Sequence, residues 1–222
     1  MLKVSIADGA SAQGRDKVRV SLKLFCAVAL AVFVFDQASK FWAVSELTLA
    51  NSTLYGESKA EDFGAQFERF WEVEHPARGR VVEVVSNFWH FRYVENPGAA
   101  FGFLSRSDSP WRTPFFLVVA VVACFVVISL YRESKPDQVI LRLALAMILG
   151  GAIGNFVDRL RLGYVIDFID WHWYDAYTWP TFNIADSGIS VGVVFMFFEM
   201  LKQARAEKLA SSESSSDKAS NG

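Results

Sequence analysis

The sequence has few of the residues that build disulfide scaffolds or metal clusters, and it has almost no net charge. It contains two cysteines and three histidines, and its formal net charge is −2. A nucleic-acid-binding surface would be strongly basic, so the charge argues against that class. Cys26 and Cys124 both lie inside apolar runs, where we expect small hydrophobic residues rather than a disulfide or metal pair. The histidines are scattered, without the spacing of metal ligands.

Long apolar runs are what the sequence has instead. Of its 222 residues, 52% are hydrophobic, and the mean hydropathy is +0.24. These values are high for a soluble domain and modest for a chain wholly within lipid, so several membrane spans and an aqueous part are expected. The runs interpreted as spans are residues 22–44, 114–131, 139–157 and 187–201.

The first apolar run resembles a signal peptide, because basic residues precede it. It nevertheless continues to membrane-spanning length, and no small-x-small cleavage site follows directly. We therefore predict a retained span. The spans and the segments that join them define one domain at 21–203, flanked by a polar extension at 1–20 and a serine-rich tail at 204–222. Both flanks are predicted to be disordered and cytoplasmic.

The polar segment 45–113 predicts a small sheet at the membrane surface. Its stretches 81–85 and 88–94 combine β-branched and aromatic residues at strand-like length. Pro97-Gly98 marks a turn in which Gly98 permits close backbone approach. Residues 161–181 carry many aromatic side chains and are interpreted as a loop at the headgroup level.

Basic residues predict the orientation of the spans. They precede the first span, separate the second from the third and follow the fourth, and the positive-inside rule places all these regions in the cytoplasm. The segments 45–113 and 159–185 then face outside. The basic residues are Arg15, Lys17, Arg19, Lys23, Arg132, Lys135, Lys202, Arg205 and Lys208.

Asp158 and Asp186 lie where one span leaves the membrane and the next re-enters it, so a single loop brings both carboxyls to the same depth. Two close carboxyls share a proton, which suits aspartyl hydrolysis: the ionised member activates water and the protonated member polarises a peptide carbonyl. The alternative is structural, with Asp186 capping the fourth span. Spacing alone leaves both interpretations open.

Other polar residues near these acids are further candidates. Asp36 and Lys40 stand four apart on one helical face and either neutralise one another or support the site. Arg159 either contacts lipid phosphate or pairs with a carboxylate. The other acids of the outer loop are interpreted by default as turn and surface residues. Asp167 is the first candidate for an exception among them. Three amides either bind a substrate backbone or satisfy their own loops: Asn96, Asn155 and Asn183.

Two non-enzymatic classes compete with hydrolysis. A transporter or proton relay would distribute its acids across the membrane depth, with one near the midplane, whereas the two principal acids here cluster at one rim. A structural anchor would not need the polar motifs. Among other membrane aspartyl proteases, the presenilin and prepilin-peptidase types use Gly-x-Gly-Asp, and this chain has Asn155-Phe156-Val157-Asp158.

Five sequence blocks, in order, resemble the lipoprotein signal peptidases (signal peptidase II), which are bacterial membrane aspartyl peptidases. The resemblance covers about residues 20–203. The blocks are DQASK at 36–40, YVENPGAAFG at 93–102, GNFVDR at 154–159, VIDFID at 165–170 and FNIADS at 182–187.

This resemblance implies an all-α membrane protein with four transmembrane helices and a small extracytoplasmic β-cradle, located in the inner membrane with its active site at the outer face. It implies cleavage of diacylglyceryl prolipoproteins just before the lipidated cysteine, no metal or cofactor, and inhibition by globomycin-type cyclic peptides. Asp158 and Asp186 become the expected catalytic pair. The residues expected to bind substrate or support the site are Asn96, Gly98, Asn155, Arg159, Asn183, Asp36 and Lys40. The terminal extensions and a polar insert at about 50–85 depart from the family pattern.

Overall fold

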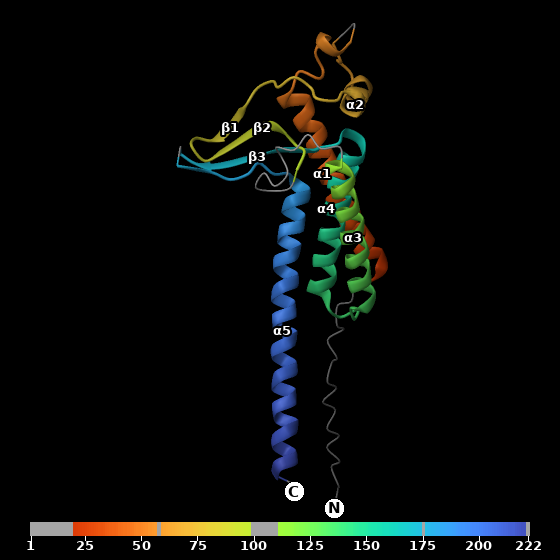
Figure 1. Ribbon diagram of the computed structural model, residues 1–222, viewed down its shortest axis with the longest axis vertical. Helices are drawn as coiled ribbons and strands as arrows, with labels where there is room; N and C mark the ends of the chain where they lie inside the picture. Colours follow the sequence, from red (N-terminus) through yellow and green to blue (C-terminus); the bar gives the residue numbers. More distant parts are fainter. Residues whose placement is uncertain (1–19, 57–58, 99–110, 175, 221–222) are drawn as a thin grey trace, which may run out of the picture.

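The computed structural model describes residues 20–56, 59–98, 111–174 and 176–220. Four of its helices are long and apolar enough to cross a membrane, which confirms the four predicted spans (Figure 1). The helices are α1 (Leu22–Leu47), α3 (Arg112–Glu133), α4 (Val139–Leu162) and α5 (Ile184–Ser220), whose apolar part is Ile184–Ala206.

Helix α4 is the centre of the helical part. In its most apolar window 61% of the residues are buried within the protein, against 17%, 11% and 17% for α1, α3 and α5. It packs against all three of these helices. Small residues allow the close approach: a Cβ at Gly150 would lie 2.4 Å from the Ala29 carbonyl oxygen of α1, and one at Gly151 would lie 2.5 Å from the Ala185 carbonyl oxygen of α5.

Gly151→Ala is expected to destabilise the protein, because the added methyl meets backbone of α5 that cannot rotate away. Overpacking of this kind costs about 1–3 kcal/mol. Gly64→Ala is the matched control, since its Cβ would approach only the Asp62 side chain, at 3.2 Å, and alanine favours helices. Thermal unfolding in detergent should show a lowered melting temperature for Gly151→Ala alone. Equal melting temperatures for the two variants would contradict this account of α4–α5 packing.

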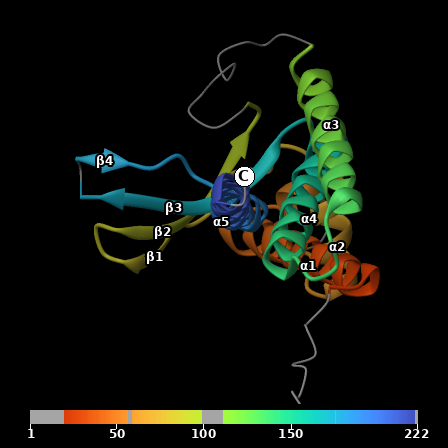
Figure 2. The same cartoon turned by 90° about the horizontal axis from the view of Figure 1, so that it is seen from below.

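The end of the molecule opposite the C-terminus carries a four-stranded antiparallel sheet in the order β1-β2-β3-β4 (Figure 1). Strands β1 (Val82–Val85) and β2 (Trp89–Asn96) confirm the two predicted strands. Strands β3 (Val165–Trp173) and β4 (Tyr177–Thr178) replace the predicted aromatic loop. That prediction was wrong because the first six residues of β3 are all buried, so no alternation of exposed and buried residues marks the strand. Figure 2 shows the sheet extending sideways from the helices.

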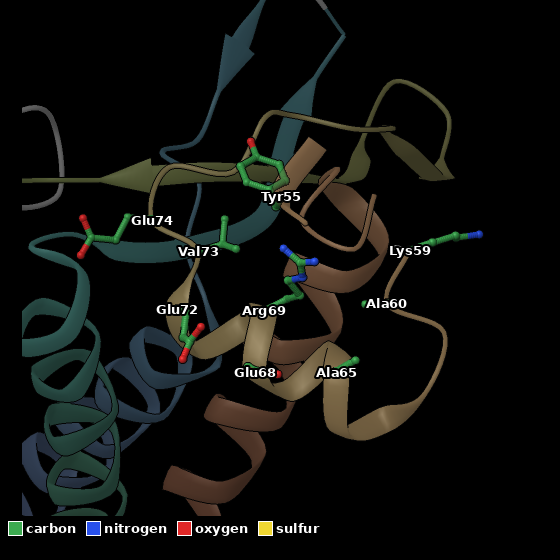
Figure 3. A pocket seen from close by; sticks show the side chains of 9 residues that line it. All are labelled: Tyr55, Lys59, Ala60, Ala65, Glu68, Arg69, Glu72, Val73 and Glu74. Atoms are coloured by element: carbon green, nitrogen blue, oxygen red, sulfur yellow. The ribbon is translucent and has the colours of Figure 1, made fainter. Parts of the chain in front are cut away.

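The polar insert folds beside the outer end of α1. It contains a 3-10 turn (Thr53–Tyr55) and the amphipathic helix α2 (Phe63–Glu72), which the Asp62 side chain caps. Phe70 of α2 is buried and packs edge-on against Phe41 of α1. A cavity of about 600 Å³ lies between α2 and the preceding turn, and Arg69 projects into it toward Tyr55 (Figure 3).

The C-terminal tail differs from the prediction of disorder. Helix α5 continues to Ser220 and reaches well past the ends of the other helices (Figure 1). Residues 202–210 are mostly Lys, Gln, Ala, Arg, Glu and Leu, all strong helix formers, and this propensity outweighs the polar composition. The predicted disordered extension at 1–20 lies outside the described residues except for Val20.

Candidate active site

A buried ion-pair cluster joins α1 to α4 near the outer end of the helices. Lys40 Nζ lies 2.8 Å from Asp36 Oδ2 and 2.8 Å from Asp158 Oδ2, and it donates to Asn155 Oδ1 at 3.0 Å. Asp36 Oδ1 also accepts from the backbone N–H of Ala185 at the start of α5. The pairing of Asp36 with Lys40 is thus confirmed, with Asp158 as a second carboxylate on the same ammonium.

Asp158 is saturated by structural contacts. Its Oδ1 accepts from Gln37 Nε2 at 3.2 Å, and its Oδ2 accepts from the backbone N–H of Ile166 at 3.1 Å as well as facing Lys40. The side chain is fully buried. A carboxylate held in this way joins α4 to α1 and β3, and the Lys40 ammonium neutralises its charge.

Asp167, on β3, is a buried carboxyl held by two side-chain amides. Its Oδ1 accepts from Asn183 Nδ2 at 2.7 Å, and its Oδ2 accepts from Asn96 Nδ2 at 2.8 Å. Burial raises the pKa of this carboxyl well above its usual range, and the charge of Asp186 raises it further, while the hydrogen bonds from Asn96 and Asn183 and the charge of Lys40 lower it.

Asp186 is positioned by a reciprocal cap at the start of α5. Its backbone N–H donates to Asn183 Oδ1 at 2.9 Å, and the Asn183 N–H donates back to Asp186 Oδ2 at 3.3 Å. Asn155 Nδ2 donates to Asp186 Oδ1 at 2.8 Å. The capping interpretation is therefore confirmed, and the cap leaves Asp186 on the wall of a cavity. Capping and chemistry are compatible roles for this residue.

The cavity measures about 560 Å³ and lies between the sheet, α4 and α5. Its polar residues gather around Asp186, while aromatic side chains of β3 and the following segment and aliphatic side chains of α5 form the rest of the wall. The lining residues are Asn96, Gly98, Asn155, Arg159, Val165, Trp171, Trp179, Pro180, Thr181, Phe182, Asp186, Ser187, Ile189, Ser190 and Val191.

The predicted site residues divide into two groups. Asn96, Gly98, Asn155, Arg159 and Asp186 line the cavity. The others lie behind it in the buried network and support it without reaching the cavity: Asp36, Lys40, Asp158 and Asn183.

Arg159 extends over one side of the cavity with only weak attachments. Its guanidinium lies 3.5 Å from the carbonyl oxygens of Asn155 and Gly98, and it stands 5.0 Å above the Phe116 ring. Such long contacts cost little to exchange, so this cation is available to a carbonyl or phosphate oxygen of a bound molecule.

Trp171 and Trp179 line the cavity, but the sequence did not predict them as site residues. Asp167 was predicted only as an alternative. The signal for Asp167 was an acid between apolar residues, Val165-Ile166-Asp167-Phe168, because an acid inside a buried strand requires specific partners. The tryptophans gave no such signal, since interfacial aromatic belts have the same composition.

Comparison with known proteins places this site in a family. A model of the family described as "Signal peptidase (SPase) II" matches residues 28–202. The chain belongs to the signal peptidase II family. A lipoprotein signal peptidase of Anaeromyxobacter sp. (strain Fw109-5) is 38% identical over 197 residues, which cover 87% of this chain and 92% of the relative. One of Geobacter sulfurreducens is 44% identical over 124 residues, covering 56% of this chain and 76% of the relative.

The fold has a counterpart among solved structures. A bacterial membrane enzyme determined by the in meso method at 1.9 Å resolution superposes with a TM-score of 0.62 at 22% identity, covering 84% of this chain and 97% of that one. The peptidase is thus a multi-pass membrane aspartic endopeptidase that removes signal peptides from diacylglyceryl-modified prolipoproteins, cleaving before the lipidated cysteine.

Proposed function

We propose that Asp167 and Asp186 are the two carboxyls that hydrolyse the scissile bond. The observation that carries this assignment is the side chain of Asn183, which donates to Asp167 and accepts from the backbone of Asp186, and so holds both acids in one arrangement. Asp186 lines the cavity, and Asp167 is buried but shares Asn183 with Asp186. Asp158 is also buried, but it pairs with the Lys40 ammonium and is linked to Asp186 through Lys40 and Asn155.

The two acids differ in environment and therefore in role. The raised pKa of Asp167 favours its protonated form at neutral pH, so Asp167 polarises the peptide carbonyl. Asp186 is the ionised base at the helix N-terminus, where a negative charge is stabilised. It takes a proton from water as the water oxygen attacks the carbonyl carbon. The tetrahedral intermediate then collapses: the C–N bond breaks, and a proton from the pair goes to the leaving amine.

The cavity suits a peptide that carries a lipid. Asn96, Asn155 and Arg159 present amide and guanidinium groups to the peptide backbone near Asp186. The outer half of α5, with Ile189 and Val191 in the wall, continues as an apolar surface along which acyl chains can lie. Anchoring by the acyl chains fixes the scissile bond at the depth of the two acids and raises its effective concentration. The same cavity would accept globomycin-type cyclic peptides as mimics that are not cleaved.

We further propose that the sheet end of the molecule is extracytoplasmic and both termini are cytoplasmic. The start of α1 lies at the turn between α3 and α4, since the Val20 N–H donates to the Pro136 carbonyl at 2.9 Å. The far end of α5 points the same way (Figure 1). Among the described residues, the basic positions at the start of α1, in the turn between α3 and α4 and in the far part of α5 therefore lie at one end, opposite the sheet, as the positive-inside rule requires.

The pH dependence of cleavage tests the assignment of the shared proton. Activity is expected to fall with rising pH as Asp167 loses its proton, and to fall at low pH as Asp186 gains one. Asn96→Ala removes a hydrogen bond that favours ionised Asp167, so the pKa of Asp167 rises and the alkaline limb of kcat/KM moves to higher pH.

Asn51→Ala, in the polar insert, is the matched control and leaves the alkaline limb in place. The profile is measured by gel-shift cleavage of a diacylglyceryl prolipoprotein in detergent. An alkaline limb that stays fixed or moves to lower pH in Asn96→Ala would refute the role given to Asp167.

A further inference from the structure

Two of the three histidines, far apart in sequence, meet on the outer sheet. His90 lies on β2 and His172 on β3, with ring centroids 4.4 Å apart. Asp170 of β3 stands directly opposite His90 in the strand register. One ligand atom from each of these three side chains lies within 4.8 Å of the other two. Spacing along the chain could not reveal this cluster, because strand pairing creates it.

The register adds a fourth donor, a second carboxylate, on the same face. Glu83 of β1 is the cross-strand partner of His90, and its Oε2 lies 3.3 Å from His90 Nε2. That nitrogen is shielded from solvent and makes no hydrogen bond among the described residues. The side chains of His90, His172 and Asp170 are 23%, 13% and 8% exposed, whereas Glu83 is 58% exposed and stands at the rim. The cluster is therefore enclosed on one side and accessible on the other.

We propose that His90, Asp170 and His172, with Glu83 as a fourth donor, form a binding site for a divalent transition metal of the zinc class. Two imidazoles and two carboxylates are a donor set that Zn²⁺ accepts in tetrahedral geometry. Bond lengths of about 2.0–2.2 Å place neighbouring donors of such a site about 3.5 Å apart. The present spacing reaches that value through small side-chain rotations.

Arg92 orients the carboxylate of this site. Its Nε lies 2.9 Å from Asp170 Oδ2 and its Nη2 donates to Asp170 Oδ1 at 3.2 Å. Carboxylates that bind metals are commonly held by such an outer partner. The Arg92 charge also offsets one of the two acids, so a bound divalent cation leaves the cluster with one positive charge. The competing explanation is a hydrogen-bond network that is complete without metal, and it predicts no saturable binding.

The metal site is distinct from the peptidase site. Successive side chains of a strand alternate between its faces, which puts Asp170 and His172 on one face of β3 and Asp167 and Trp171 on the other. Arg92 connects the two sites, because its Nη2 also donates to Thr181 of the cavity wall at 3.4 Å. A metal held by β1, β2 and β3 would fasten the three strands together. The expected effect is stabilisation of the sheet that carries Asp167, with no part in bond cleavage.

Metal binding by the full chain in detergent tests this inference, with any affinity tag removed because polyhistidine binds the same metals. Co²⁺ is titrated while its visible d–d absorption is recorded, and Zn²⁺ is then used to displace it. We expect one metal per chain, a tetrahedral Co²⁺ spectrum and a melting temperature that rises with added Zn²⁺. Arg92→Met should weaken binding about tenfold.

His90→Gln and His172→Gln should each weaken binding more than Arg92→Met does, and should remove the rise in melting temperature. His75→Gln is the matched control, because the third histidine lies elsewhere, against Glu95. Glu83→Gln, at an exposed position, should weaken binding without disturbing the fold. Wild-type binding no tighter than that of the His90→Gln/His172→Gln double variant, or an equal loss in His75→Gln, would overturn the proposal.

Discussion

Replacing either Asp167 or Asp186 by asparagine is expected to lower the rate of prolipoprotein cleavage by at least about 10³-fold, within the range for loss of general acid–base catalysis. Asparagine keeps the size of the side chain but can neither accept the proton from water nor carry the shared proton. The Asp167→Asn/Asp186→Asn double variant should be no slower than either single variant, because two groups that act as one unit give non-additive losses.

Asp158→Asn is the decisive comparison. Asp158 pairs with Lys40 and does not reach the cavity, so its loss should reduce the amount of folded protein while leaving most of the cleavage rate per folded molecule. The measurement is a gel-shift assay on a diacylglyceryl prolipoprotein at matched levels of folded enzyme. Full loss of cleavage in folded Asp158→Asn, with cleavage retained in Asp167→Asn, would return the pair to Asp158 and Asp186.

Lys40→Met is expected to be the most destabilising single exchange in the membrane part. It removes the ammonium that faces both Asp36 and Asp158, and all three side chains are fully buried. Breaking a buried pair by removing one partner costs about 3–5 kcal/mol, because an uncompensated charge stays behind. Thermal unfolding in detergent should show a large fall in melting temperature.

Lys202→Met is the matched control for this prediction. Lys202 is 3.7 Å from Glu199 and is 74% exposed, and surface pairs of this kind contribute at most about 1 kcal/mol. The triple variant Asp36→Asn/Lys40→Met/Asp158→Asn removes the buried charges together and should recover part of the lost stability. Equal losses in Lys40→Met and Lys202→Met would show that the buried cluster does not hold α1 against α4.

The spans were predictable because each apolar run is long and bounded by charged or turn-forming residues. Strand β3 was not, since its buried run Val165–Asp170 lacks the alternation that marks a half-exposed strand. Because β3 was not predicted, the sequence did not place Asp167 near Asp186, and the proposed pair differs from the one expected from the sequence. Asp158 was assigned from its place at the end of an apolar run, but pairing across helices and strands decides which acid meets Asp186.

Contacts at the helix ends were predictable only where the two residues are close in sequence. The proximity of Asp186 to its cap residue Asn183 follows from spacing of three residues, so the sequence contains it. The contacts that join Lys40 to Asp158 and Asn155 span more than a hundred residues, and only the packed structure reveals them. The grouping of His90 with His172 depends on strand register in the same way.

The Lys40 cluster also determines where the enzyme can open. It fastens α1, α4, the beginning of β3 and the first turn of α5 at one point, so these parts move as a unit. The remaining wall of the cavity consists of residues 179–182 and of α5 beyond its first turn, where Ile189 and Val191 supply aliphatic side chains and none of the buried ion pairs among the described residues lies. A bulky lipid-bearing chain should therefore enter from the bilayer on the α5 side, and the cleaved signal helix should leave through the same lateral opening.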